Sequence, residues 1–205
     1  MLSLIHIYLA ADQPKHNFTI SIVDDVTNLS LPRPKIHDIL PKGTIQCKFW
    51  GLGSDGTVGA NKQAVDIIGT HTDMHAQAYF DYDSKKSGGL TISHLRFGNK
   101  EIKAPYLINQ ADFISCSNQS YMYKYNLLDG LKDGGTFLFN TTMSPEELAE
   151  KMPAAMKRTL AEKQAKFYII DAVNIAKDLG LGNHTKDVYK RQVPGMATLA
   201  VIAAI

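Results

Sequence analysis

Residues 49–62 read FWGLGSDGTVGANK and place Gly51, Gly53 and Gly56 in the spacing Gly-x-Gly-x-x-Gly. A predicted strand at residues 45–50 precedes them, and residues 60–68 follow with apolar positions at helical spacing. In such loops one glycine permits a tight turn, the next lets a phosphate approach the backbone, and the last allows close helix–strand packing. The stretch predicts a β-loop-α unit that binds a nucleotide-like ligand on the N–H groups opening the helix. The alternative is a glycine-rich turn that binds nothing.

Strand and helix patterns alternate along the rest of the chain. Strands are predicted at residues 18–23, 45–50, 76–82, 90–97, 111–116, 136–140 and 166–170. Helices are predicted at residues 60–68, 118–128, 153–164 and 172–179, and after the capping sequence Ser144-Pro145-Glu146-Glu147. Strands that recur between helices imply crossover connections. The expected fold is therefore α/β: a Rossmann-like, mainly parallel sheet with helices on both faces.

Composition narrows the class of protein. With 205 residues, 44% hydrophobic and 20% charged, the chain is long and apolar enough for one globular domain. A net charge of +2 gives no field that would favour nucleic acid or an anionic membrane. Cys47 and Cys116 are too few for a disulfide framework or an iron–sulfur cluster, which favours a reducing, cytoplasmic setting.

The two ends differ in pattern from the middle. Residues 2–7 (LSLIHI) and 187–192 (DVYKRQ) are similar to translated sequencing-adapter read-through. We therefore expect residues 1–15 to be artefact or a disordered end and residues 186–205 to be artefact or a non-native tail. The alternative is an ordinary terminal strand and helix. Residues 16–43 are expected to be the end of a preceding domain and an extended linker, and residues 44–185 the main domain.

A second loop with ligand-binding character covers residues 83–89 (DSKKSGG). It leaves the end of a predicted strand, and its adjacent Lys85 and Lys86 suit phosphate groups. The alternative is a solvated surface turn.

Asp55 lies in the loop that carries Gly51, Gly53 and Gly56, here called the glycine loop. It is interpreted either as a helix cap or as an acceptor for a ribose hydroxyl or base amine. No catalytic triad, metal-ligand cluster or paired-carboxylate site stands out.

Four segments resemble pyruvate:ferredoxin (flavodoxin) oxidoreductases: residues 24–32 (DDVTNLSLP), 49–62, 76–83 (AQAYFDYD) and 84–98 (SKKSGGLTISHLRFG). The similarity runs from about Phe18 to Asn183. It implies that the chain is a fragment, inactive alone, of a long, homodimeric, multidomain enzyme with thiamine diphosphate, magnesium and [4Fe-4S] clusters. That enzyme converts pyruvate and coenzyme A to acetyl-CoA and carbon dioxide and reduces ferredoxin or flavodoxin.

The resemblance also implies what this fragment contributes. It corresponds to a gamma-type domain implicated in coenzyme A binding, while the thiamine and cluster sites lie in other domains. The coenzyme A contacts expected from the resemblance are Gly51, Leu52, Gly53, Ser54, Asp55, Asp83 and Asn183. Charge adds Lys85, Lys86 and Arg96, since Arg96 suits a phosphate or a carboxylate of a partner domain. Two alternatives remain: an NAD(P)-binding dehydrogenase domain, with Asp81 and Asp83 near the ribose position, and a purely structural domain.

Overall fold

The computed structural model describes residues 17–20, 22, 26–31, 40–83 and 88–178. The chain divides into two compact units, with the boundary between Ile39 and Leu40. In the first unit, β1 (Thr19–Ile20) and β2 (Ser30–Leu31) form a two-stranded parallel sheet. Of the strand predicted at residues 18–23, residues 19–20 form β1, and residues 21 and 23 lie outside the described residues. Strand β2 lies in a segment predicted to be an extended linker. The end segments 1–15 and 186–205 lie outside the described residues.

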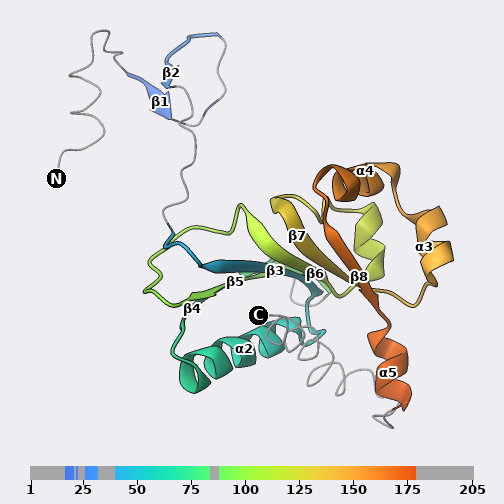
Figure 1. Ribbon diagram of the computed structural model, residues 1–205. Helices are drawn as coiled ribbons and strands as arrows, with labels where there is room; N and C mark the ends of the chain where they lie inside the picture. Colours follow the sequence, from blue (N-terminus) through green and yellow to red (C-terminus); the bar gives the residue numbers. More distant parts are fainter. Residues whose placement is uncertain (1–16, 21, 23–25, 32–39, 84–87, 179–205) are drawn as a thin grey trace. The chain divides into compact units, whose positions relative to one another are not determined.

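The second unit is built on one six-stranded sheet with the order β4-β5-β3-β6-β7-β8 (Figure 1). Its strands are β3 (Ile45–Leu52), β4 (His75–Tyr82), β5 (Leu90–Gly98), β6 (Ala111–Cys116), β7 (Leu131–Asn140) and β8 (Lys166–Ile170). The β3–β6, β6–β7 and β7–β8 pairs are parallel, whereas β5 runs antiparallel to both β3 and β4. The predicted mainly parallel sheet is confirmed, with β5 as the reversed strand.

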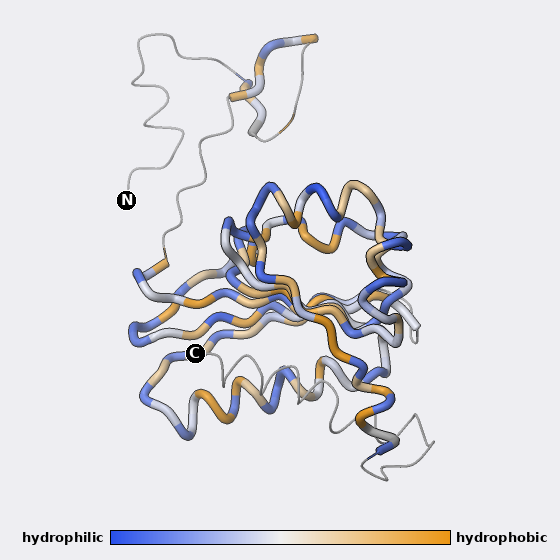
Figure 2. Tube along the Cα trace, turned by 45° about the vertical axis from the view of Figure 1, so that its right-hand side comes forward, coloured by the Kyte–Doolittle hydropathy of each residue, from blue (hydrophilic) through white to orange (hydrophobic). Residues whose placement is uncertain are grey.

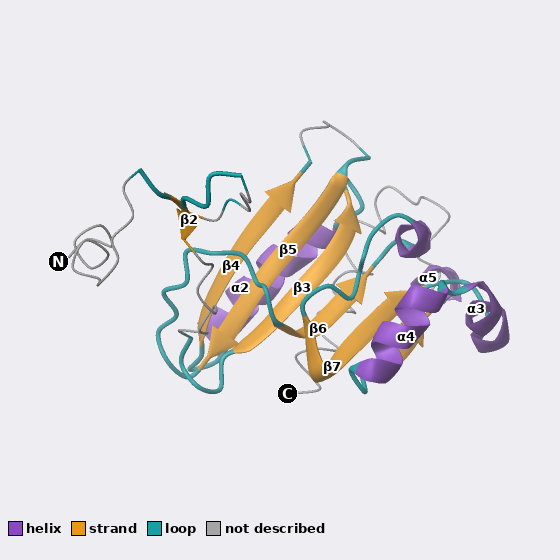
Figure 3. Cartoon of the chain, turned by 90° about the horizontal axis from the view of Figure 1, so that it is seen from above, coloured by secondary structure: helices purple, strands orange, loops and turns teal. Residues whose placement is uncertain are grey.

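Helices cover both faces of this sheet, as the sequence predicts. The long helix α2 (Thr57–His71) packs on one face against β3, β4 and β5, and α4 (Ala154–Glu162) lies on the other face over β7 (Figure 3). The remaining helices are α3 (Pro145–Lys151) and α5 (Ala172–Asp178). Ser144 caps α3 as predicted, because its side chain accepts a hydrogen bond from the Glu147 N–H.

The helix predicted at residues 118–128 is wrong. Only a 3-10 helix, η1 (Gln119–Tyr123), forms there, and β7 begins at Leu131, five residues before the predicted strand at 136–140. Leu127 and Leu128 are buried in the core cluster that includes residues of α3 and α4, and Gly130 turns the chain with a φ of +76° into β7. Tertiary burial of these leucines therefore overrides the local helical pattern.

Two apolar clusters form the core, one on each face of the sheet. Cys47, Phe49, Leu95 and Phe97 face α2, whereas the opposite face packs strand residues against α3 and α4. Strand side chains alternate between the two faces, so β3 contributes Phe49 to one cluster and Trp50 to the other. Hydropathy along the chain follows this pattern, with hydrophobic positions along the strands and recurring along α2 (Figure 2).

His94 and Arg96 are structural residues of β5. Arg96 is buried and donates hydrogen bonds to the Tyr106 carbonyl (2.8 Å) and to Gln46 Oε1 (3.2 Å). His94 is also buried, and its Nδ1 accepts the Ile108 N–H (3.2 Å). Both side chains hold the segment that follows β5 against the sheet.

This environment predicts an acid-sensitive fold. Burial first, and then the charges of Lys48 and Arg96, lower the pKa of His94 to about 4. His94 is therefore neutral in the folded protein but takes up a proton below about pH 6.5 once unfolded. Stability should fall between pH 6.5 and pH 4, by at most about 1.4 kcal/mol per pH unit.

Urea unfolding measured from pH 4 to pH 7 checks this expectation. The variant His94→Gln should show a flatter pH dependence than the original protein. The matched control, His75→Gln, changes an exposed histidine and should keep the original slope. Equal slopes for the original protein and His94→Gln would contradict the assignment.

Candidate functional site

The loop between β3 and α2 lies between two cavities at the carboxyl ends of the parallel strands, where ligands bind in open α/β sheets. The β4–β5 cavity has a volume of about 370 Å³, and its walls include Gly56, Val58, Tyr82, Asp83, Gly89 and Thr91. The β6–β7 cavity has a volume of about 390 Å³ and is lined by Ser117, Asn118, Gln119, Asn140, Thr141, Thr142 and Val173. Residues 52–55 line both cavities, so the glycine loop is the ridge between them.

Asp55 holds this loop in place. Its Oδ2 accepts hydrogen bonds from the Leu52 N–H and the Ser117 hydroxyl, both at 2.8 Å, and its Oδ1 accepts the Thr57 N–H at 2.8 Å. The carboxylate thus joins the end of β3, the start of α2 and the residue after β6. The bond to the Thr57 N–H places Asp55 at the start of α2, one residue before the N-cap Gly56.

The glycines of the loop are required for close contacts within the protein. A Cβ at Gly51 would lie 2.7 Å from the Thr57 Cβ, so this glycine lets α2 begin directly against β3. The Gly53 N–H donates to the Gly89 carbonyl at 2.7 Å, and a Cβ at Gly53 would lie 3.2 Å from that oxygen. Gly53 therefore brings the glycine loop and the β4–β5 loop together.

The structure brings together part of the predicted site. Gly53, Ser54 and Asp55 line both cavities together with Leu52, and Asp83 lines the β4–β5 cavity. Gly51 lies buried beneath the loop, where its carbonyl accepts the Tyr121 hydroxyl (3.3 Å).

The other predicted contacts do not join this group. Lys85, Lys86 and Asn183 lie outside the described residues. Arg96 of β5 pairs with Gln46 of β3. This pair lies at the end of β5 opposite to Thr91, which pairs with Gly51, and Arg96 lines neither cavity. Its guanidinium is buried against protein carbonyl and amide oxygens, so Arg96 lies apart from the other described residues of the predicted site.

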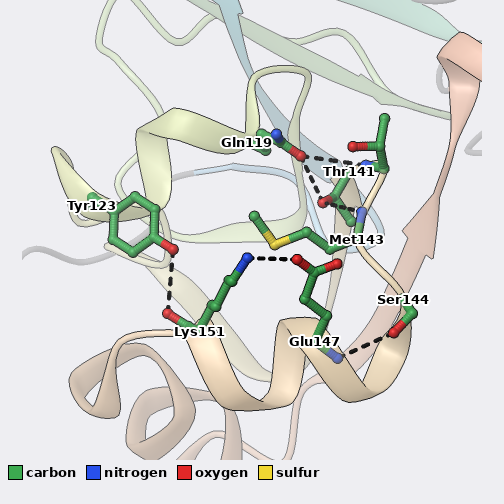
Figure 4. Close-up of polar contacts among 8 residues, drawn as sticks. Gln119, Tyr123, Thr141, Met143, Ser144, Glu147 and Lys151 are labelled. Carbon is green, nitrogen blue, oxygen red and sulfur yellow. Dashed lines mark hydrogen bonds and ion pairs between the residues drawn. The ribbon is translucent and has the colours of Figure 1, made fainter.

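The sequence patterns did not single out the polar residues at the ends of β6 and β7. Asn140 donates to the Ser117 carbonyl (3.0 Å) and accepts the Ala172 N–H (3.1 Å), which joins the ends of these strands to α5. Thr141 donates its hydroxyl to Gln119 Oε1 at 2.9 Å (Figure 4). The signal was present in the sequence, since polar residues that directly follow a predicted strand lie at the ligand-binding edge.

The two thiols do not fit redox or nucleophilic chemistry. Burial raises the pKa of the Cys116 thiol to about 12, and burial also raises the pKa of Cys47. Both remain protonated near neutral pH, whereas cluster ligation and nucleophilic attack need a thiolate. Within the described ranges no group of three His, Cys, Asp or Glu residues is placed to hold a metal ion.

Family comparison agrees with the sequence resemblance. The profile of the family "Pyruvate ferredoxin/flavodoxin oxidoreductase" matches residues 46–205. The chain belongs to this family. It is 60% identical over 183 residues to the pyruvate:ferredoxin oxidoreductase of Moorella thermoacetica, covering 89% of this chain and 16% of that protein. It is 62% identical over 175 residues to the pyruvate-flavodoxin oxidoreductase of Enterobacter agglomerans, covering 85% of this chain and 15% of that protein.

Solved structures confirm the fold class of this family member. Pyruvate oxidoreductase subunit PORC of Thermotoga maritima matches with a TM-score of 0.54 at 18% identity, over 79% of this chain and 76% of that chain. The 2-oxoglutarate:ferredoxin oxidoreductase of Magnetococcus marinus matches with a TM-score of 0.51 at 10% identity, over 80% of this chain and 28% of that chain. In the described part of the chain, none of the helices has the length and apolar character needed to cross a bilayer.

The hydrogen bonds of Asp55 give a prediction about stability. Asp55→Ala removes the acceptor of two backbone N–H groups and of the Ser117 hydroxyl, so it should lower the free energy of unfolding by about 2–3 kcal/mol. Asp66→Ala, at an exposed position of α2, is the matched control and should change the free energy of unfolding by less than about 0.5 kcal/mol. Urea unfolding measures both. Similar stabilities for the two variants would show that Asp55 does not brace the loop.

Proposed function

We propose that this chain is one domain of a pyruvate:ferredoxin or pyruvate:flavodoxin oxidoreductase and that it contributes to coenzyme A binding and to domain packing. The complete enzyme converts pyruvate, coenzyme A and the oxidised carrier to acetyl-CoA, carbon dioxide and the reduced carrier. The observation that carries the proposal is the glycine loop with a cavity on each side, at the ligand-binding edge of the sheet. The chain spans about a sixth of the length of the curated relatives described above.

The chemistry of coenzyme A suits this site. Its phosphates require donors and positive charge, which the loop at residues 83–89 offers through Lys85 and Lys86, and its long arm requires a second compartment. We include Asp83 and Asn183 among the proposed contacts. The Magnetococcus marinus enzyme, which has the same fold, was solved with 2-oxoglutarate, coenzyme A and succinyl-CoA bound, and this supports a coenzyme A site.

The remaining chemistry belongs, in this proposal, to other parts of the enzyme. Thiamine diphosphate, magnesium and [4Fe-4S] clusters would be held outside this chain, since its two protonated thiols do not fit a cluster that needs four thiolates. Other domains of a homodimeric enzyme and a ferredoxin or flavodoxin are the proposed partners, and the cytoplasm is the proposed location. Family membership does not favour a stand-alone NAD(P)-dependent dehydrogenase.

A substitution at Gly53 tests the glycine loop. Gly53→Val places a branched side chain against the Gly89 backbone, so the two loops must separate and coenzyme A affinity should fall at least about tenfold. The matched control is Gly69→Val, because Gly69 lies in α2 with open space around its Cβ position and lines neither cavity. Calorimetric titration of each variant with coenzyme A gives the affinities. Unchanged affinity in Gly53→Val would remove the loop from the site.

The paired lysines test the ligand class. Replacing Lys85 and Lys86 together by alanine should weaken coenzyme A binding about tenfold and reduce its dependence on salt, because each ammonium offers a charge-assisted contact to phosphate. Titration at low and high salt measures both effects, with NADH as a comparison ligand. Tighter binding of NADH than of coenzyme A by the original protein would favour the dehydrogenase alternative. Equal affinity in the double variant would remove the lysines from the site.

A further inference from the structure

An apolar groove lies between α3, α4 and β8, apart from the β4–β5 and β6–β7 cavities. Its volume is about 690 Å³, and it shares no lining residue with either cavity. Among its described wall residues only Lys157 is charged, and the apolar side chains come from all three elements: Pro145, Leu148, Ala149, Leu160, Phe167 and Ile169 are examples. Extended apolar surface of this kind marks an interaction site on a protein.

Strand β8 forms one wall of the groove and also one edge of the sheet (Figure 1). In the described part of the chain it pairs with β7 alone, from Lys166 to Ile170 and without a bulge. Edge strands are commonly protected by charges, proline or bulges, whereas residues 167–170 read FYII. Tyr168 is 56% exposed and Ile169 37% exposed, on opposite faces of the sheet. The outer backbone groups of β8 are therefore suited to pairing with a further strand.

The cation in the groove wall has no carboxylate partner among the described residues. None of the ion pairs there involves Lys157, which is exposed, or Lys166 at the start of β8. An ammonium group is best matched by a carboxylate. The groove therefore favours an occupant that is mainly apolar and carries an acidic side chain.

The relatives are long polypeptides in which this domain is a small part. The matched segment is 16% of the Moorella thermoacetica protein and 15% of the Enterobacter agglomerans protein, so most of each polypeptide lies outside it. A segment of the same polypeptide meets the groove at a high effective concentration and can cover it without strong intrinsic affinity. A separate protein must first offset the loss of its translational and rotational freedom. This difference favours an occupant from the same polypeptide.

We propose that, in the complete enzyme, an extended segment from another domain of the same polypeptide covers this groove. The segment adds a strand to β8 and places an acidic side chain at Lys157. Strand addition supplies backbone hydrogen bonds, and alternate side chains of the added strand enter the groove beside Phe167 and Ile169. This inference rests on the proposed function and names the surface through which the domain packs.

A photo-reactive residue at position 169 tests the occupant in the complete enzyme. With Ile169→p-benzoylphenylalanine, ultraviolet light should join β8 to a segment outside the domain formed by residues 40–178, and mass spectrometry of the joined peptides identifies that segment. The matched control carries the same residue at Glu101, an exposed position that does not line the groove, and should not give this product.

Charge reversal tests the acidic contact. Lys157→Glu should raise the amide hydrogen-exchange rates of residues 166–170 at least about tenfold, because a repelled strand opens more often. Lys157→Arg keeps the positive charge and should stay within about twofold of the original enzyme. Arg158→Glu makes the same reversal at the next residue of α4, which does not line the groove, and should leave the rates unchanged. Thermal melting shows whether each variant is folded.

The outcomes separate this inference from the proposed function. A cross-link from position 169 that stays within this domain overturns the inference, and so do equal exchange rates in Lys157→Glu and the original enzyme. A product of doubled mass on a denaturing gel assigns the groove to a second polypeptide and rejects the proposed occupant. In each case, turnover of pyruvate and coenzyme A by the original enzyme leaves the proposed function standing. Absence of that turnover rejects the proposed function, and the inference with it.

Discussion

The hydrogen bonds to the Asp55 carboxylate are the contacts on which the geometry of the site depends. A glycine-rich loop has a large backbone entropy, and it keeps one shape only where the protein restrains it. Asp55 provides that restraint by joining Leu52, Thr57 and Ser117, which belong to the end of β3, the start of α2 and the turn after β6. The loop can therefore stand as a fixed ridge between two cavities.

The reversed strand β5 is the second constraint on the site. Because β4 and β5 form a hairpin, the loop joining them lies at the same edge of the sheet as the glycine loop. The Gly53 N–H then reaches the Gly89 carbonyl, and the second glycine of the fingerprint serves loop-to-loop contact. The dinucleotide-like sequence pattern thus joins two loops in this domain, and its predicted contact with a phosphate belongs to the proposed function.

Residue types that commonly carry chemistry serve the fold elsewhere in the domain. Arg96 and His94 fasten the segment after β5, and the buried Lys48 donates to the Asp129 carbonyl at 3.0 Å. Burial lowers the pKa of Lys48 and of His94, because the charged form of each loses solvation inside the domain. The bond from Lys48 to the Asp129 carbonyl offsets part of this cost. These three charged or titratable residues therefore stabilise the fold of the domain.

The sequence by itself determined most of the elements, the fold class and the family, because strand and helix periods and the FWGLGSDGTVGANK stretch are local signals. It located residues 52–55 and Asp83 at the ligand-binding edge, since each follows a predicted strand. Only the tertiary structure decided the reversal of β5, the burial of Arg96 and the short 3-10 helix at Gln119–Tyr123. It alone also brought Gln119 to Thr141, because contacts between residues distant in the chain depend on strand order and on competition for the core, which no local pattern records.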